Sequence, residues 1–182
     1  MKSPKSMTET PLIPTICACD PDSNTPAFAL FEDGKLTQWI ILPRNKAPRS
    51  QSAYSWLIDV PYLAEQWSPD ILVIENQYLP PNTGNSRAQS VFTLVASRGM
   101  ITACFLIAGV PVRLVEPFKW QRSLGGSKQG RDALKQQSML KASDIAGCPI
   151  INHNIADAIN IGYFWVMTSR VHVCAAPTGG YE

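Results

Sequence analysis

Residues 70–75 of the chain read Asp-Ile-Leu-Val-Ile-Glu, a run of four apolar side chains between two acids. An unbroken run of apolar, mostly β-branched residues is typical of a central strand that is covered on both faces. Glu75 ends this run, and an ionised acid beside a buried strand needs a partner. The stretch therefore predicts a layered α/β domain with an acid at the carboxyl end of a central strand.

The residues before this strand predict a second central strand and a hairpin. Residues 13–20 form a short apolar run that continues into Asp-Pro-Asp-Ser-Asn, which is typical of a strand entering a turn. Asp33-Gly34 stands between the apolar runs 27–31 and 36–42. Because Asp-Gly tolerates positive φ, this arrangement predicts a hairpin with a type I′ turn.

Helical spacing appears twice in the middle of the chain. Residues 50–67 have it, and Pro61 is expected to kink or split that helix. Residues 86–108 predict a long helix that stops at Gly109. Residues 110–115 are then predicted to form the next buried strand.

The last third predicts a Gly-rich basic loop, a polar helix over about residues 131–145, and a final helix from Ile155 to about Ser169 with Asn154 as its N-cap. This order of elements predicts an α/β fold with a mixed sheet, an antiparallel hairpin at one edge and parallel strands beside it, flanked by helices. We expect one domain over residues 13–170, a disordered tail at 1–12 and a C-terminal tail at 171–182.

Composition narrows the class of protein. The chain has 182 residues, is 45% apolar and has no apolar window long enough to span a bilayer. Its N-terminus has no apolar core like that of a signal peptide, so a soluble, cytoplasmic protein is expected. Five cysteines without a Cys-x-x-Cys pair argue against zinc and predict small buried side chains in a reducing compartment.

Charge is distributed unevenly, although the net charge is only +2. One segment contains a single acid, Asp132, and six cations: Lys119, Arg122, Lys128, Arg131, Lys135 and Lys141. A smaller basic group, Arg44, Lys46 and Arg49, falls in an expected loop. Such a segment is either a nucleic-acid contact or a solvated helix face.

Asp20, Glu75 and Asp157 are the candidate metal ligands, because two end predicted central strands and the third lies in the first turn of the last helix. Hydrolysis of a phosphodiester by two metal ions needs a few convergent oxygen ligands for Mg²⁺ or Mn²⁺. Each acid also has a structural interpretation: an Asx turn for Asp20, a helix-dipole acid for Asp157, and for Glu75 an ion pair with one of three arginines, Arg87, Arg98 or Arg113.

Four short motifs, in order, resemble the RuvC family of Holliday-junction resolvases, whose fold is RNase H-like with a five-stranded sheet. Residues 16–23 resemble its opening strand, and Ile74-Glu75-Asn76-Gln77-Tyr78 resembles its second motif. Ala96-Ser97-Arg98-Gly99 and Ala156-Asp157-Ala158-Ile159 resemble its central and closing helices. The resemblance covers residues 13–165.

The resemblance implies roles for individual residues. Asp20, Glu75 and Asp157 would be metal ligands, with two Mg²⁺ ions per site and Mn²⁺ as a substitute. The family's fourth ligand is Asp or His, but this chain has Asn154 there, so His153 beside it is an alternative. Asp22 also departs from the family, which has Gly at that position.

Other implied roles concern DNA. Tyr78 would stack on an unpaired base, unless it is a partly buried loop tyrosine. Lys119 and Lys135 would act near the scissile phosphate, with Lys128 as an alternative to Lys135. The DNA-binding set is then Tyr78, Lys119, Arg122, Lys128, Arg131 and Lys135.

The implied activity is paired nicking of a four-way junction by a homodimer, leaving a 5′ phosphate and a 3′ hydroxyl. The apolar side of the helix at 86–108 would be either the dimer contact or domain core. Broader cutting of flaps, forks or RNA–DNA hybrids, and a module that binds junctions without cutting, remain alternatives. An actin-like sugar kinase or ATPase also has Asp-Pro-Asp-Ser after a strand, but the chain is too short for its two domains.

Overall fold

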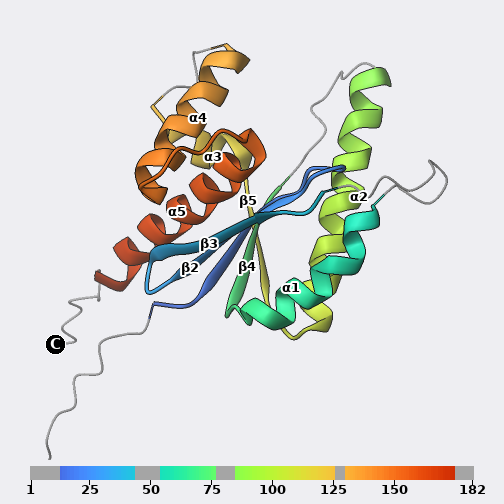
Figure 1. Cartoon of the computed structure of the whole chain (residues 1–182), viewed down its shortest axis with the longest axis horizontal. Helices are drawn as coiled ribbons and strands as arrows, with labels where there is room; N and C mark the ends of the chain where they lie inside the picture. Colours follow the sequence, from blue (N-terminus) through green and yellow to red (C-terminus); the bar gives the residue numbers. More distant parts are fainter. Residues whose placement is uncertain (1–12, 44–53, 77–84, 126–129, 175–182) are drawn as a thin grey trace, which may run out of the picture.

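A computed structural model of the chain describes residues 13–43, 54–76, 85–125 and 130–174. Its centre is a five-stranded sheet with the strand order β3-β2-β1-β4-β5 (Figure 1). The β1–β2 and β2–β3 pairs are antiparallel, whereas β1–β4 and β4–β5 are parallel, as predicted. The strands are β1 (Ile16–Asp20), β2 (Ala27–Glu32), β3 (Lys35–Ile41), β4 (Ile71–Glu75) and β5 (Val112–Val115).

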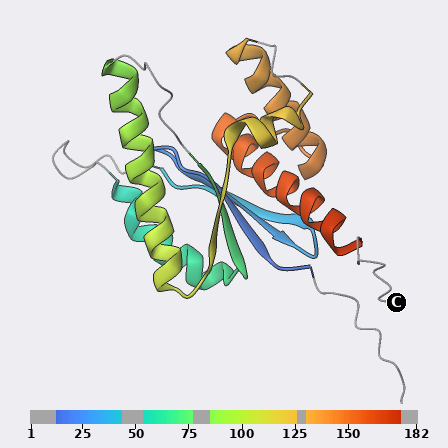
Figure 2. The ribbon, with the colours of Figure 1, turned by 180° about the vertical axis from the view of Figure 1, so that it is seen from behind.

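Helices cover the two faces of this sheet in separate groups (Figures 1 and 2). One face carries a 3₁₀ turn, η1 (Ser55–Ile58), with α1 (Asp59–Trp67) and α2 (Asn85–Ile107). The other face carries α3 (Pro117–Arg122), α4 (Arg131–Ala146) and α5 (His153–Cys174). No helix in the described ranges is both long and apolar enough to cross a membrane.

The hairpin forms as its sequence predicts. Asp33 and Gly34 both have positive φ, 51° and 72°, which is the type I′ geometry. The break between α1 and η1 falls at Asp59, and Pro61 lies in the first turn of α1, where a missing backbone N–H costs little. The predicted split is therefore present, but it precedes the proline.

Three sequence-based expectations need correction. The strand at Val112–Val115 is the edge of the sheet, with Arg113 and Leu114 exposed, so it is not a buried strand. The basic loop begins with a short helix, α3, that was not predicted, although Pro117 at its start favours a helix N-terminus. Among the cysteines, Cys17 and Cys19 are fully buried as expected, but Cys148 is exposed.

The last helix begins earlier than predicted and has a different cap. α5 starts at His153 and continues to Cys174, beyond the predicted end at Ser169. The side chain of Asn152 accepts hydrogen bonds from the backbone N–H groups of Asn154 (3.0 Å) and Ile155 (3.1 Å). Asn152 is therefore the N-cap, and Asn154 is free for another role.

Gly162 lets α5 lie directly on the sheet. A Cβ atom at this position would stand 2.2 Å from the Phe31 ring and 2.9 Å from the Cβ of Ala18. Both neighbours are fully buried. Only glycine fits between the helix and strands β1 and β2 at this point, so α5 can approach the sheet closely here.

Candidate active site

The pleat of the strands places Asp20 and Glu75 on the same face of the sheet. Ile16 and Ala18 of β1 belong to the core under α4 and α5, whereas Cys17 and Cys19 belong to the core under α1 and α2. Since side chains alternate along a strand, Asp20 points to the α5 side. The same alternation in β4, with Val73 under α5, puts Glu75 on that side as well.

The register then makes the two acids neighbours. Cys19 pairs with Ile74 in the parallel β1–β4 ladder, so the next residues, Asp20 and Glu75, end adjacent strands about 4.8 Å apart. The carboxyl ends of parallel strands are where α/β folds bind ligands. Two of the three predicted acids are thus brought together by the sheet alone.

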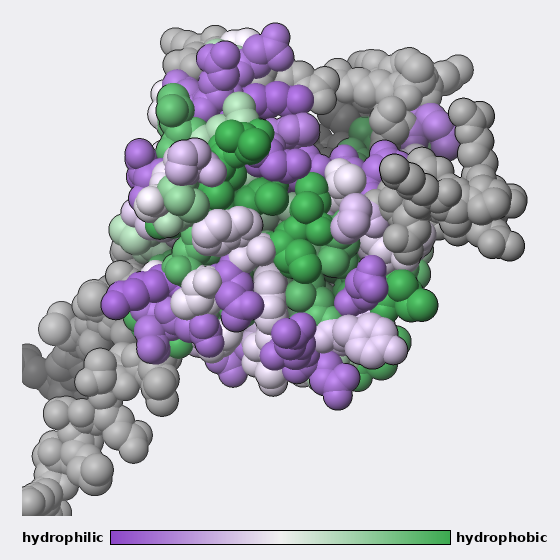
Figure 3. All heavy atoms as spheres, viewed as in Figure 1, coloured by the Kyte–Doolittle hydropathy of each residue, from purple (hydrophilic) through white to green (hydrophobic). Residues whose placement is uncertain are grey.

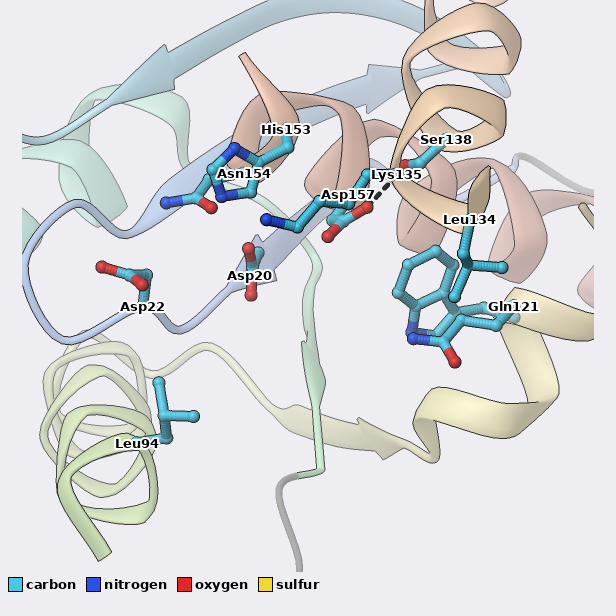
Figure 4. Close-up of a pocket in the computed structure, with 11 residues that line it drawn as sticks. Asp20, Asp22, Leu94, Gln121, Leu134, Lys135, Ser138, His153, Asn154 and Asp157 are labelled. Carbon is cyan, nitrogen blue, oxygen red and sulfur yellow. Dashed lines mark hydrogen bonds between the residues drawn. The ribbon is translucent and has the colours of Figure 1, made fainter. Parts of the chain in front are cut away.

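The third acid comes from α5. This helix packs across β1 and β2, and Asp157 in its second turn faces Asp20 (Figure 4). Between them is a cavity of about 250 Å³. Its lining residues are Asp20, Asp22, Leu94, Trp120, Gln121, Leu134, Lys135, Ser138, His153, Asn154 and Asp157.

Burial and mutual repulsion make the ionised acids costly. The pKa of Asp20 is raised well above its usual value, first by burial and then by the charges of Glu75, Asp157 and Asp22. Burial raises the pKa of Asp157 to about 6, although a hydrogen bond from Ser138 and the charge of Lys135 act in the opposite direction. Such a cluster favours either protons or a bound cation.

Two of the acids accept hydrogen bonds from neutral donors. The indole Nε1 of Trp120 donates to Oε1 of Glu75 at 2.9 Å, and the hydroxyl of Ser138 donates to Oδ1 of Asp157 at 2.5 Å. No side chain of the described residues donates a hydrogen bond to the Asp20 carboxylate. Arg98, one expected partner of Glu75, donates to Oδ1 of the adjacent Asn76.

The carboxylate and amide oxygens of this site are ligands that a hard divalent cation prefers, but they do not converge on a single position. Within the described residues, no three His, Cys, Asp or Glu side chains stand close enough to hold a metal ion together. Glu75 is buried (7% exposed) and does not line the cavity between Asp20 and Asp157. For all three acids to share a cation, their carboxylates would have to come closer together than they are in this structure.

Asn154 and His153 both line the cavity, but they are held differently. His153 is exposed, whereas Asn154 is buried. The amide nitrogen of Asn154 donates to the backbone oxygen of Thr25 (3.0 Å) and to its hydroxyl (2.9 Å). Thr25 is in turn held by Asp22, whose Oδ1 accepts from the Thr25 N–H at 2.8 Å. With its nitrogen engaged, Asn154 has its carbonyl oxygen left as the atom able to bind a cation.

Of the predicted basic residues, Lys135 lies at the site. It lines the cavity from α4. Lys119 and Arg122 are exposed on α3, next to the cavity residue Trp120 but outside the lining itself. Lys141 packs over the Tyr163 ring, 5.1 Å from its centre, and faces a different part of the surface. Figure 3 shows hydrophilic side chains gathered over α4, at the top of that view.

Several predicted residues cannot be placed. Tyr78 and Lys128 lie outside the described residues, as does the basic group Arg44, Lys46 and Arg49. Arg131 begins α4, but its side chain is not described. Conversely, Trp120 and Ser138 were not predicted as site residues; the only available signal was Pro117, which marks the helix that carries Trp120.

No protein-family model and no curated protein matches the sequence. Solved structures match in fold. Thermus thermophilus RuvC is similar with a TM-score of 0.63 and 15% identity, over 87% of this chain and 96% of that one. The same protein has been solved in complex with a Holliday junction substrate, at a TM-score of 0.62, 15% identity and coverage of 86% and 95%.

A viral resolvase is a further match in fold. The fowlpox virus Holliday junction resolvase is similar at a TM-score of 0.51 and 18% identity, over 85% of this chain and 99% of that one. At these identities the likeness establishes the fold. The chain therefore has the predicted RNase H-like fold, and Holliday junction resolvases are among its structural neighbours.

Proposed function

We propose that the protein is a divalent-cation-dependent DNA endonuclease whose preferred substrate is a four-way junction. The observation that carries this proposal is the convergence of Asp20, Glu75 and Asp157 from β1, β4 and α5. Three acids far apart in sequence share one electrostatic environment at the carboxyl ends of two central strands. A site that only stabilised the fold would gain nothing from this repulsion.

The residues suggest how the cations would be held. The charges of Glu75 and Asp157 both act on Asp20, so Asp20 would be the ligand that the two ions share. Glu75 would bind one of them, and Asp157 with Asn154 or His153 the other. A pair of Mg²⁺ or Mn²⁺ ions supplies an activated water and stabilises the leaving oxygen of a phosphodiester. Neutral Asn154 would add an oxygen ligand without adding negative charge to a cluster that already includes Asp22.

Other side chains would handle the DNA phosphate. Lys135 reaches the cavity, where its charge can stabilise the negative charge that develops on the phosphoryl oxygens. Lys119 and Arg122 on the exposed side of α3, together with Lys128, Arg131 and Tyr78, would extend this contact along the DNA. Hydrolysis at such a site leaves a 5′ phosphate and a 3′ hydroxyl.

Preference for four-way junctions is inferred from the structural neighbours that act on them. Two-fold symmetric cutting requires a homodimer. Ile101 and Phe105 of α2 are buried in the core of the single chain and cannot form a dimer contact. Phe92, Leu106 and Ile107 of the same helix are exposed, and they are the apolar side chains on α2 that a second copy could cover.

A second candidate is a module that grips branched DNA without cutting it. It is favoured by the neutral Asn154 at one ligand position and by the absence, among the described residues, of three ligands already at metal-binding distance. Cutting of flaps or forks by the same site is a variant of the main proposal.

A cleavage assay separates these functions. The protein and its Asp20→Asn variant are incubated with a four-way junction, a replication fork and a linear duplex in Mg²⁺ or Mn²⁺. We expect paired nicks in the junction by the wild type, and binding without cutting by the variant. Binding without cutting by both proteins would identify the binding module, and equal cutting of all three substrates would refute the junction preference.

A further inference from the structure

A chain of buried polar groups stands behind Asp157, between α4 and α5. Ser138 of α4 and Asn160 of α5 are both only 2% exposed. Asn160 lies three residues after Asp157, which puts both side chains on the face of α5 that meets α4. The contacts run from Asn160 to Ser138 and from Ser138 to Asp157, whose carboxylate lines the cavity.

The direction of the first hydrogen bond is fixed by chemistry. The side-chain nitrogen of Asn160 lies 2.9 Å from the backbone oxygen of Ser138 and 2.9 Å from its hydroxyl. A carbonyl oxygen can only accept, so the nitrogen of the amide must be on this side. The opposite orientation would bring two acceptor oxygens together.

This orientation has a cost elsewhere. The carbonyl oxygen of Asn160 is buried and finds no hydrogen-bond partner among the described residues. An unpaired buried acceptor costs about 1–3 kcal/mol. The hydrogen bonds of this side chain are therefore made by its nitrogen, which contacts Ser138 twice.

The direction of the second hydrogen bond follows from the first. A serine hydroxyl has one proton, and the Ser138 oxygen already accepts from Asn160. Its proton is therefore directed to Oδ1 of Asp157, 2.5 Å away. Figure 4 shows this bond on one carboxylate oxygen of Asp157, while the other oxygen lies on the side of Asp20.

We propose that Ser138, oriented by Asn160, is a positioning residue that holds the Asp157 carboxylate in the orientation needed to share a cation with Asp20. Without the hydroxyl, Asp157 would turn away from the like charge of Asp20, and each binding event would have to bring it back. Groups that orient metal ligands in this way contribute about 10–100-fold to metal affinity. This inference rests on the proposed metal site.

α4 offers a matched control. The hydroxyl of Ser143 also makes one donated and one accepted bond: it donates to the Met139 backbone oxygen at 2.7 Å and accepts from the Ile150 N–H at 2.9 Å. Ser143 is absent from the lining of the cavity. Ser143→Ala and Ser138→Ala therefore each remove one donated and one accepted hydrogen bond from the same helix, and only Ser138→Ala reaches an acid of the site.

The test is binding of Mn²⁺ alone to the full chain, measured by titration calorimetry without DNA. We expect Ser138→Ala to weaken binding at least about tenfold and Ser143→Ala to leave it unchanged. The isosteric pair Ser138→Thr and Ser138→Val controls for packing, since the two side chains differ by the hydroxyl. Ser138→Thr should bind at least about tenfold more tightly than Ser138→Val.

The outcomes separate this inference from the proposed function. If the wild type binds Mn²⁺ more tightly than Asp20→Asn but the Thr and Val variants bind equally, the role of Ser138 is refuted and the metal site stands. If the wild type binds no better than Asp20→Asn, the metal site itself is refuted. Weakened binding in Ser143→Ala equal to that in Ser138→Ala would reduce the effect to general loss of stability.

Discussion

The two faces of the sheet are packed in different ways, although they share every strand. The face under α1 and α2 is closed by large apolar side chains, including Trp56, Phe28 and Phe105, all fully buried. The face under α4 and α5 contains a comparable apolar core, but its end near Asp20 opens into a cavity lined mainly by polar side chains. Of the buried polar residues in the described part of the chain, only Ser97 belongs to the α1–α2 side; the others are Glu75, Ser138, Asn154 and Asn160.

The buried polar groups on the two faces differ in how well they are stabilised. The hydroxyl of Ser97 donates a hydrogen bond to the Thr93 backbone oxygen of its own helix, at 3.1 Å. On the other face, like charges are held together and Asn160 keeps an unpaired oxygen. Local costs of this kind concentrate at functional sites, where they are part of the mechanism. The face under α1 and α2 contributes packing, whereas the face under α4 and α5 contributes packing and carries the candidate site at one end.

Two residues of β1 that point to opposite faces give the largest contrast. Asp20→Asn should lower cleavage of a four-way junction by about a thousandfold or more, because a shared metal ligand contributes several kcal/mol to the transition state. Cys17→Ala, under α1 and α2, should keep cleavage within about twofold and lose about 1 kcal/mol of stability. Initial cleavage rates and urea unfolding measure the two effects. Comparable loss of cleavage in both variants would contradict the division of the faces.

Two helical glycines provide the next contrast. Gly162→Ala should reduce the free energy of unfolding by about 1–3 kcal/mol, since its methyl group would overlap the Phe31 ring. Gly99→Ala on α2 meets nothing within 4 Å and should raise it by about 0.5–1 kcal/mol. Urea unfolding of both variants decides. Equal effects would show that α5 does not lie as close to the sheet as described.

The site should also make stability depend on pH. The pKa of Asp157 is raised to about 6 in the folded chain, so between about pH 4 and 6 the folded state keeps a proton that the unfolded state has lost. Stability without metal should therefore fall as pH rises through this range, by on the order of 2 kcal/mol. Unfolding midpoints across this range measure the slope. Asp157→Asn should reduce the slope without abolishing it, because the pKa of Asp20 is raised as well. An unchanged slope in that variant would assign the effect to other groups.

The smallest expected effect is a gain of stability in a variant without activity. Without metal at pH 8, Asp20→Asn replaces a buried acid, whose charged form is disfavoured by burial and by neighbouring acids, with a neutral amide, and it should raise the free energy of unfolding by about 0.5–2 kcal/mol. Added Mn²⁺ should stabilise the wild type but not this variant. Thermal unfolding with and without Mn²⁺ provides the measurement. A destabilised Asp20→Asn protein would show that the acid supports the fold.

Features set by local pattern were predictable from sequence, and those set by tertiary context were not. The unbroken apolar run before Glu75 indicated a central strand, and Asp33-Gly34 indicated the hairpin turn. The prediction that β5 is buried was wrong, because β5 lies at the edge of the sheet. An edge position depends on which strands pair, and the residues at 112–115 do not encode that pairing. The prediction of Asn154 as the helix cap was wrong because Asn152, two residues earlier, has the same side chain and caps the helix instead.

The residues of the candidate site also differ in whether local sequence pattern or tertiary context identifies them. Asp20, Glu75 and Asp157 could be selected from sequence because each follows a recognisable strand end or helix start. Ser138 could not, because a serine in a polar helix has no signature until α4 is docked on α5. The DNA-binding assignments all remain predictions, and two of the residues, Tyr78 and Lys128, lie outside the described residues.

The central claim is that Asp20, Glu75 and Asp157 bind the same divalent cations, and anomalous diffraction from crystals soaked in Mn²⁺ tests it most directly. We predict anomalous peaks among these three carboxylates in the wild type and no such peaks in Asp20→Asn. Peaks elsewhere on the surface, or none in a crystal whose site is open to solvent, would contradict the assignment.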